Sequence, residues 1–181
     1  EQTGDRRFVY DAYRRFIQLF GKVALGIDDE HFDKHFEAVK KRVGVKADVG
    51  LEADHLKEIS DRFLEVVQRQ TGREFPQDVM LQLQLAVEAV FRSWMGKRAV
   101  DYRTASGIPH DLGTAVNVQT MAFGNLGERS GTGVAMSRNA ATGEPELEGD
   151  FLENAQGEDV VAGTRKTEPL SALRELVPEA Y

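Results

Sequence analysis

The chain has 181 residues, 41% of them hydrophobic, and is therefore long enough to bury a sizeable core in one domain or two small ones. Its 30 acidic residues outnumber 23 basic ones, giving a formal charge of −7. That balance argues against a general role on nucleic acid, because neutralising phosphates needs a basic excess. The absence of cysteine excludes disulfides and thiolate metal sites.

The sequence shows no signal peptide and no apolar stretch near the ~20 residues that cross a bilayer. We therefore expect a cytoplasmic protein with no membrane partner. The chain starts at Glu1 with a polar lead instead of a methionine. This start suggests a piece cut from a longer protein, although processing would look the same.

The first half of the chain has the spacing of amphipathic helices. After Asp5, apolar residues recur every three to four positions until Gly21 interrupts the run. A second helix is predicted over Asp29–Val43 and a third over about Ala53–Thr71. Gly72, directly after the third, stands where a left-handed C-cap is expected.

Pro76 opens a fourth predicted helix. Its apolar positions from Leu81 to Trp94 cover a wide arc, so we expect it to be buried against more than one neighbour. A further helix is predicted from Lys97 to about Ser106. The segment Gly107–Gly113 then has the composition of a turn-rich connector.

Beyond Leu112 glycine becomes frequent and short β-type runs appear. Apolar and small residues alternate over Gly113–Gly124 as they do in a half-buried strand. Gly131 and Gly133 stand where the backbone turns tightly or approaches a ligand closely, and a second β run, Val134–Met136, follows. Strand, glycine-rich turn, strand is a common way to place backbone N–H groups along the phosphates of a nucleotide.

The rest of the chain alternates short elements with turns. Asn139–Gly143 predicts a hairpin-like turn, and Leu147–Leu152 a strand whose charges suggest a sheet edge or the mouth of a site. Glu158–Gly163 predicts a short helix, and Leu170–Tyr181 one amphipathic helix that ends near Pro178. The fold class expected is α+β, with helices first and strands after them.

Thr132 lies between two glycines, and its loop can offer N–H donors and one hydroxyl to ATP phosphates. The motif alone favours neither this interpretation nor a plain two-glycine hairpin. Arg138 could reach a phosphate bidentately, although an exposed surface arginine is the commoner case. Glu158 and Asp159 could accept ribose hydroxyls or lie near magnesium, but the first turn of a helix explains the two carboxylates better.

Arg14 and Arg15 lie in an apolar helix, so one of them must lean toward the buried face and needs a carboxylate or an anion as partner. The pattern favours the carboxylate. His31 and His35 have zinc-compatible spacing, yet no third ligand is near and a solvated face is the better interpretation. His110 has no recognisable partner in the sequence.

No phosphate-binding P-loop, dinucleotide fingerprint or Ser/His/Asp arrangement is present. The patterns therefore indicate a soluble α+β protein with a glycine loop that could face phosphates. Six longer segments are more specific, namely residues 7–21, 72–78, 86–94, 108–119, 130–139 and 154–163. Together they resemble the amino-terminal nucleotide-binding region of the pyruvate, phosphate dikinases, and the likeness runs from Arg7 to about Leu170.

The resemblance implies an ATP-grasp fold, in which antiparallel sheets clamp ATP and a helical subdomain is inserted. It divides the chain into a helical insert over residues 1–76 and a helix plus partial ATP-grasp segment over residues 77–181. It also implies an enzyme that uses ATP and phosphate to phosphorylate a histidine on a mobile domain, and then interconverts pyruvate and phosphoenolpyruvate. The implied cofactors are ATP and Mg²⁺, the partner is the phosphohistidine domain of the parent chain, and the parent is a homodimer.

Site residues follow from the resemblance position by position. Gly131, Thr132 and Gly133 match the loop that covers the phosphates. Glu158 matches a carboxylate of the nucleotide pocket, and Arg14 matches a helical-insert arginine on the phosphate side of the closed clamp. The resemblance thus reverses the preference that pattern alone gave for Arg14 and Glu158.

The family's other functional segments have no match here. Its ATP-holding lysine and arginine would precede Glu1, its magnesium ligands would follow Tyr181, and Gln119–Phe123 would form a strand beside the pocket. We therefore expect no metal ligands within the chain, weak ATP binding and no activity of the piece alone. Two alternatives remain: a partner-docking module formed by the helices between Val23 and Gly72, and the same region of a phosphoenolpyruvate synthase or glucan-water dikinase.

Overall fold

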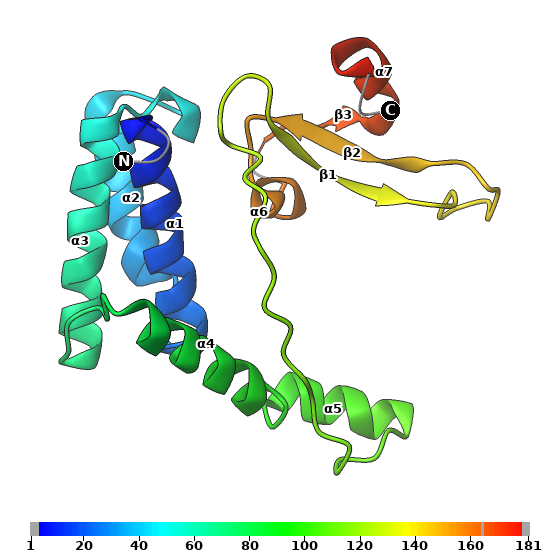
Figure 1. The fold of residues 1–181 in the computed structure, drawn as a ribbon, viewed down its shortest axis with the longest axis horizontal. Coiled ribbons are helices and arrows are strands. Elements are labelled where there is room, and N and C mark those ends of the chain that lie inside the picture. Colours follow the sequence, from blue (N-terminus) through cyan, green and yellow to red (C-terminus); the bar gives the residue numbers. More distant parts are fainter. Residues whose placement is uncertain (1–3, 164, 179–181) are drawn as a thin grey trace. The chain divides into compact units, whose positions relative to one another are not determined.

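The computed structural model describes residues 4–163 and 165–178, which form helices followed by a small antiparallel sheet (Figure 1). The predicted α+β class is confirmed. The chain divides into two compact units, residues 1–118 and 119–181. The boundary between these units, at residues 118 and 119, comes later in the sequence than the boundary at residue 76 that the resemblance implies. A functional division at residue 76 stays a prediction.

The first unit begins with α1 (Arg6–Val23), α2 (Glu30–Val43) and α3 (Ala53–Thr71), close to the predicted ranges. Gly72 caps α3 in the left-handed conformation with a φ of 71°, as expected. Gly21, by contrast, does not end α1. A Cβ at Gly21 would lie 2.6 Å from a ring carbon of Phe32, so this glycine allows α2 to approach closely.

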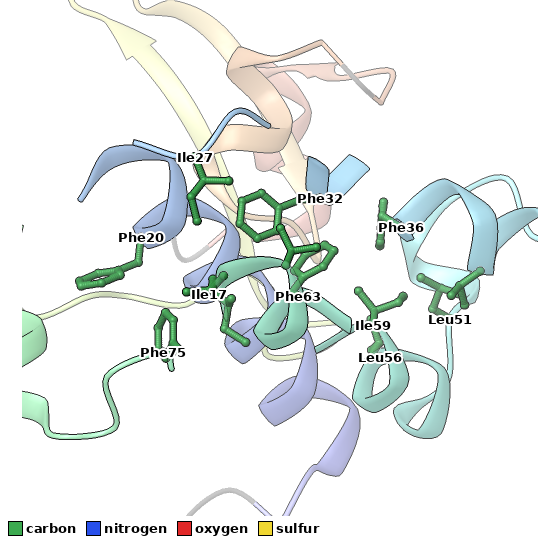
Figure 2. Close-up of a cluster of buried hydrophobic side chains, with 13 residues drawn as sticks. Ile17, Phe20, Ile27, Phe32, Phe36, Leu51, Leu56, Ile59, Phe63 and Phe75 are labelled. Carbon is green, nitrogen blue, oxygen red and sulfur yellow. The ribbon is translucent and has the colours of Figure 1, made fainter. Parts of the chain in front are cut away.

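The core of this unit lies among these three helices and the segments that join them (Figure 2). Phe32 and Phe63 meet edge to face in it, with ring centroids 5.1 Å apart. The predicted inward residues of α2 and α3 are buried there. The buried cluster comprises Ile17, Phe20, Ile27, Phe32, Phe36, Val39, Leu51, Leu56, Ile59, Phe63, Val66, Val67 and Phe75.

The fourth helix, α4 (Val79–Ser93), starts at the predicted place, because the side chain of Asp78 caps it by accepting from the backbone N–H of Leu81. The expectation that α4 is buried on several sides is wrong. Among the described residues it packs on the core through Leu85 and Ala86, whereas Met80 is 69% exposed. Much of its wide apolar arc therefore faces solvent in the described part of the chain, as the exposure of Val79, Met80 and Phe91 shows.

The helix α5 (Lys97–Ser106) has the predicted bounds and is fixed to the end of α4 by one buried arginine. The guanidinium of Arg103 lies 3.8 Å from the Trp94 ring centroid and donates to the Trp94 carbonyl and to Nδ1 of His110. The Trp94 indole N–H donates to the carbonyl of His110. His110 therefore has partners, which the sequence did not reveal.

The second unit contains β1 (Gly131–Met136), β2 (Glu148–Glu153), β3 (Glu168–Pro169) and the short helix α6 (Gly157–Val161). The strands are antiparallel in the order β1-β2-β3. The predicted strand at residues 147–152 is thus present, but it is central and not at an edge. Residues 139–143 form the expected turn, in which Asn139 Oδ1 accepts from two backbone N–H groups.

Two other predictions in this half differ from the structure. Residues 113–124, with Gln119–Phe123 among them, form no strand, and Val118 is 71% exposed. Alternating side chains do not make a strand without a neighbouring strand to pair with. Gly131 and Gly133 lie inside β1, so the predicted tight turn is wrong there, and their close approach to a ligand stays a prediction.

The predicted C-terminal helix is divided into two short pieces. A 3₁₀ turn, η2 (Leu170–Ala172), leads into α7 (Leu173–Leu176), which ends shortly before the predicted end near Pro178, and residues 179–181 lie outside the described residues. A further 3₁₀ turn, η1 (Asp48–Gly50), precedes α3. No described helix has the length and apolar character needed to cross a membrane.

Candidate functional site

The three predicted phosphate-loop residues lie at the start of β1. Gly131, Thr132 and Gly133 are paired with Glu153, Leu152 and Phe151 of β2. A Cβ at Gly133 would come within 2.7 Å of the carbonyl oxygen of Asp150. Close approach of the neighbouring strand therefore explains this glycine, and a two-glycine hairpin does not.

Thr132 and the start of α6 are neighbours in the second unit. The hydroxyl oxygen of Thr132 is 3.8 Å from the position that a Cβ on Gly157 would occupy. Glu158, the next residue, is exposed in the first turn of α6, as the pattern predicted. The hydroxyl and the carboxylate carried over from the resemblance thus come from adjoining elements.

Asp159, by contrast, serves the local fold. It is buried, and its carboxylate accepts from the backbone N–H of Gln156 at 2.9 Å, which closes a capping box. For Asp159, the structure thus agrees with the interpretation that its carboxylate belongs to the first turn of a helix. It leaves Glu158 as the carboxylate of the pair that faces solvent.

A buried hydrogen bond joins the segment before β1 to the residue that precedes α6, and the Gly-Asn dipeptide at residues 124–125 was its only sign in the sequence. Gln156 Nε2 donates to Asn125 Oδ1 at 2.7 Å. The neighbouring backbone groups are also joined, because Ala155 donates to the carbonyl of Gly124. A Cβ at Gly124 would collide with the carbonyl oxygen of Ala155, so only glycine fits there. The loop before β1 is therefore held tightly against the start of α6.

Arg14 lies in the first unit and is fully engaged by protein groups. It is 4% exposed, and its guanidinium contacts Asp11 at 2.7 Å and Asp48 at 3.0 Å. It also lies 4.5 Å from the Phe36 ring centroid. The prediction that one of the two arginines turns inward with carboxylate partners is confirmed for Arg14.

The remaining candidates show no converging ligand set. Arg138 is exposed and donates to the carbonyl of Gly143 within the hairpin turn. His31 and His35 share a pocket with basic side chains. Within residues 4–163 and 165–178, no group of three or more His, Cys, Asp or Glu side chains could hold a metal ion.

The chain is similar in sequence to proteins of one family. Residues 27–173 match the family model described as "Pyruvate phosphate dikinase, AMP/ATP-binding domain". The chain is 51% identical to a pyruvate, phosphate dikinase of Clostridium symbiosum, over 100% of this chain and 21% of that protein. It is 50% identical to the chloroplastic pyruvate, phosphate dikinase 1 of Arabidopsis thaliana, over 97% of this chain and 18% of that protein.

A pyruvate, phosphate dikinase of Rhizobium meliloti is 48% identical, over 99% of this chain and 21% of that protein. The chain thus spans about a fifth of the length of these relatives.

Proposed function

Because the chain belongs to the pyruvate phosphate dikinase AMP/ATP-binding domain family, we propose that it binds ATP and forms part of the nucleotide-binding region of a pyruvate, phosphate dikinase. The observation that carries this proposal is the identity of about half of all residues to dikinases, spread over the whole chain. The three relatives named above are all dikinases, which favours this enzyme over a phosphoenolpyruvate synthase.

In the proposed reaction ATP and phosphate phosphorylate a histidine on another domain of the parent protein. That histidine then passes the phosphoryl group between pyruvate and phosphoenolpyruvate. Such transfer depends mainly on positioning and charge neutralisation. Since the relatives are about five times longer, we propose that the 181-residue chain alone does not complete the cycle. We also propose that the magnesium ligands lie outside the 181 residues of this chain. The parent protein is proposed to be a homodimer with a cytoplasmic location.

Within the second unit, Gly131, Thr132, Gly133 and Glu158 are the proposed nucleotide contacts. Two features support the assignment. β1 is the outer strand of its sheet, so alternate backbone N–H groups point away from β2, and the Thr132 hydroxyl adjoins the element that carries Glu158. Backbone N–H groups and a hydroxyl are donors that suit phosphate oxygens.

Arg14 is the proposed phosphate-side residue of the helical insert, residues 1–76. Its partner Asp48 has a side chain that is 29% exposed, whereas Asp11 is only 5% exposed. We propose that a phosphate oxygen replaces Asp48 while Asp11 keeps the guanidinium in place. Arginine suits this exchange because its planar fork can serve two acceptors at once.

The nucleotide site is tested by titrating the ¹⁵N-labelled chain with ATP in the presence of Mg²⁺. We expect saturable amide shifts at residues 131–133 and 158, with weak affinity because an incomplete clamp forfeits preorganised contacts. Thr132→Val and Glu158→Gln should weaken binding, while Arg138→Gln, in the same hairpin, should not. Shifts confined to other residues would refute the assignment, and tight magnesium-dependent binding would refute the expectation of an incomplete site.

A second candidate, a partner-docking helical module, is favoured by one observation. Large apolar side chains are exposed on α4, including Val79 at 71% and Phe91 at 50%. Between Val23 and Gly72, where the sequence suggested docking, the large apolar side chains that are exposed among the described residues are Val23 and Val49. If docking is the function, Phe91→Ser should abolish partner capture and leave ATP-induced shifts unchanged.

A further inference from the structure

A pocket between α2 and α3 holds basic and hydrogen-bond-donating side chains that the nucleotide proposal does not use. Its volume is about 230 Å³. That is enough for a small hydrated anion, since one water occupies roughly 30 Å³ of liquid volume. The pocket is lined by His31, Lys34 and His35 from α2, and by Val66, Arg69 and Gln70 from α3.

The charge around this pocket is opposite to that of the chain as a whole, which is −7. Burial, followed by the positive charges of Arg69 and Arg62, lowers the pKa of His35 below 6.5. Lys34 acts in the same direction, and Glu65 is the opposing carboxylate. The positive charges around the pocket therefore repel a further cation and attract an anion.

The donors of the pocket are largely unused by the protein. Within the part of the chain that the structure describes, Lys34 forms no ion pair, and the side chains of His31, His35 and Gln70 form no hydrogen bond. Arg69 is paired with Glu65 at 2.8 Å, on an exposed surface where such pairs contribute little. A ligand can thus recruit these groups without breaking a buried contact.

The two histidines, one helical turn apart, also have the spacing of a metal site. Lys34 and Arg69 in the same lining oppose a divalent cation. No third His, Cys, Asp or Glu completes a metal-binding group among residues 4–163 and 165–178. The lining therefore favours an anion over a metal.

We propose that this pocket binds a small phosphate anion, inorganic phosphate or pyrophosphate. Lys34 and Arg69 supply the charge, the ring N–H groups of His31 and His35 donate to phosphate oxygens, and buried Val66 is the apolar residue of the lining. Charge-assisted donors converging from two helices are the chemistry that such anions require.

The test follows the side-chain NMR signals of both histidines while sodium phosphate or sodium pyrophosphate is added at constant ionic strength. We expect saturable shifts and an increase in the pKa of His35, because a bound anion stabilises the imidazolium. Pyrophosphate should bind more tightly than phosphate if charge dominates. Lys34→Ala should weaken binding by about fivefold or more, whereas Lys41→Ala, an exposed lysine on the same helix, should change it less than about twofold.

A gain-of-function variant separates binding from loss of fold. Glu65→Gln removes the competitor of Arg69 and should tighten phosphate binding, although it removes an ion pair from the protein. The proposal is overturned if the shifts grow linearly without saturation, or if Lys34→Ala and Lys41→Ala behave alike. Saturation by Zn²⁺ in place of phosphate would equally overturn it.

Discussion

At the scale of single residues, buried charge on α1 is balanced locally. Arg14 and Asp11 are both 4% exposed, and Arg15 adds a second contact to the same carboxylate at 3.3 Å. Removing one partner of a buried pair strands the other without water or a counter-charge. The fold thus needs Arg14 whether or not this residue also binds a phosphate.

Arg14→Ala should therefore lower the free energy of unfolding by about 3 kcal/mol, near the lower end of the usual range because Arg15 remains beside Asp11. Urea denaturation measures the change. Arg6→Ala is the matched control, since its pair with Asp54 is exposed and should contribute less than about 1 kcal/mol. Equal effects of the two variants would contradict the importance of burial.

Glu58 gives the surface of the first unit a defined pH dependence. Its carboxylate accepts from Arg42 and from Arg62, and these hydrogen bonds, the one from Arg42 first, lower its pKa below 4.5. A carboxylate with a depressed pKa stabilises the folded state above its unfolded pKa, and this stabilisation is lost as the pH falls through the folded value.

Glu58→Gln should consequently be less stable than the parent chain at pH 7, with the difference shrinking below about pH 4.5. Urea denaturation at a series of pH values measures it. In an Arg42→Gln background the same substitution should show a smaller pH-dependent difference, because the main cause of the shift is gone. Parallel stability curves for Glu58→Gln and the parent would refute the assignment.

At the scale of elements, the bounds of most helices could be predicted, whereas the strands could be predicted only in part, since residues 147–152 form one and residues 113–124 do not. The bounds of α3 and α5 coincide with those predicted, because apolar spacing and glycine caps are local properties. Residues 113–124 have the alternation of a strand but no strand to pair with, and pairing is a property of distant segments. The exposure of α4 has the same origin, since its pattern shows which face is apolar but not what covers it.

In the candidate site, too, local features could be predicted from the sequence, whereas contacts between distant segments could not. That either Arg14 or Arg15 turns inward and is compensated by a carboxylate or an anion could be predicted from one helix, because a buried arginine needs a partner. The link from Gln156 to Asn125 spans 31 residues and could not be read. The sequence predicts a tight turn or a nearby ligand at the glycines of β1. It does not show that the neighbouring strand β2 leaves no room for a side chain there.

Crowding at β1 leads to a prediction for the sheet. Gly133→Ala should destabilise the pairing of β1 with β2 by about 1–3 kcal/mol, because the new methyl group meets the Asp150 carbonyl. Gly157→Ala is the control, since its Cβ meets only Thr132 at an ordinary distance of 3.8 Å. Amide hydrogen exchange across residues 131–136 and 148–153 measures the effect. Faster exchange with both variants, or with neither, would contradict it.

At the scale of the whole molecule, the two compact units have unequal cores. The first unit buries a cluster of 13 apolar residues, rich in aromatic rings. The apolar residues buried in the second unit are Phe151, Leu152, Ala155 and Leu170, among those the structure describes. A smaller buried apolar area offsets less of the conformational entropy lost on folding. The second unit should thus be the less stable one.

Unfolding of the chain should accordingly occur in two steps, with residues 119–178 opening at a lower urea concentration than residues 4–118. Hydrogen exchange monitored by mass spectrometry across a urea series separates the two, because peptides report on each unit. Phe151→Ala should shift the first step only and Phe63→Ala the second only, each by about 3–5 kcal/mol as for other buried phenylalanines. Distant sites without shared contacts are expected to act independently. If either variant moved both steps equally, the units would fold as one, and the boundary near residue 118 would have no energetic meaning.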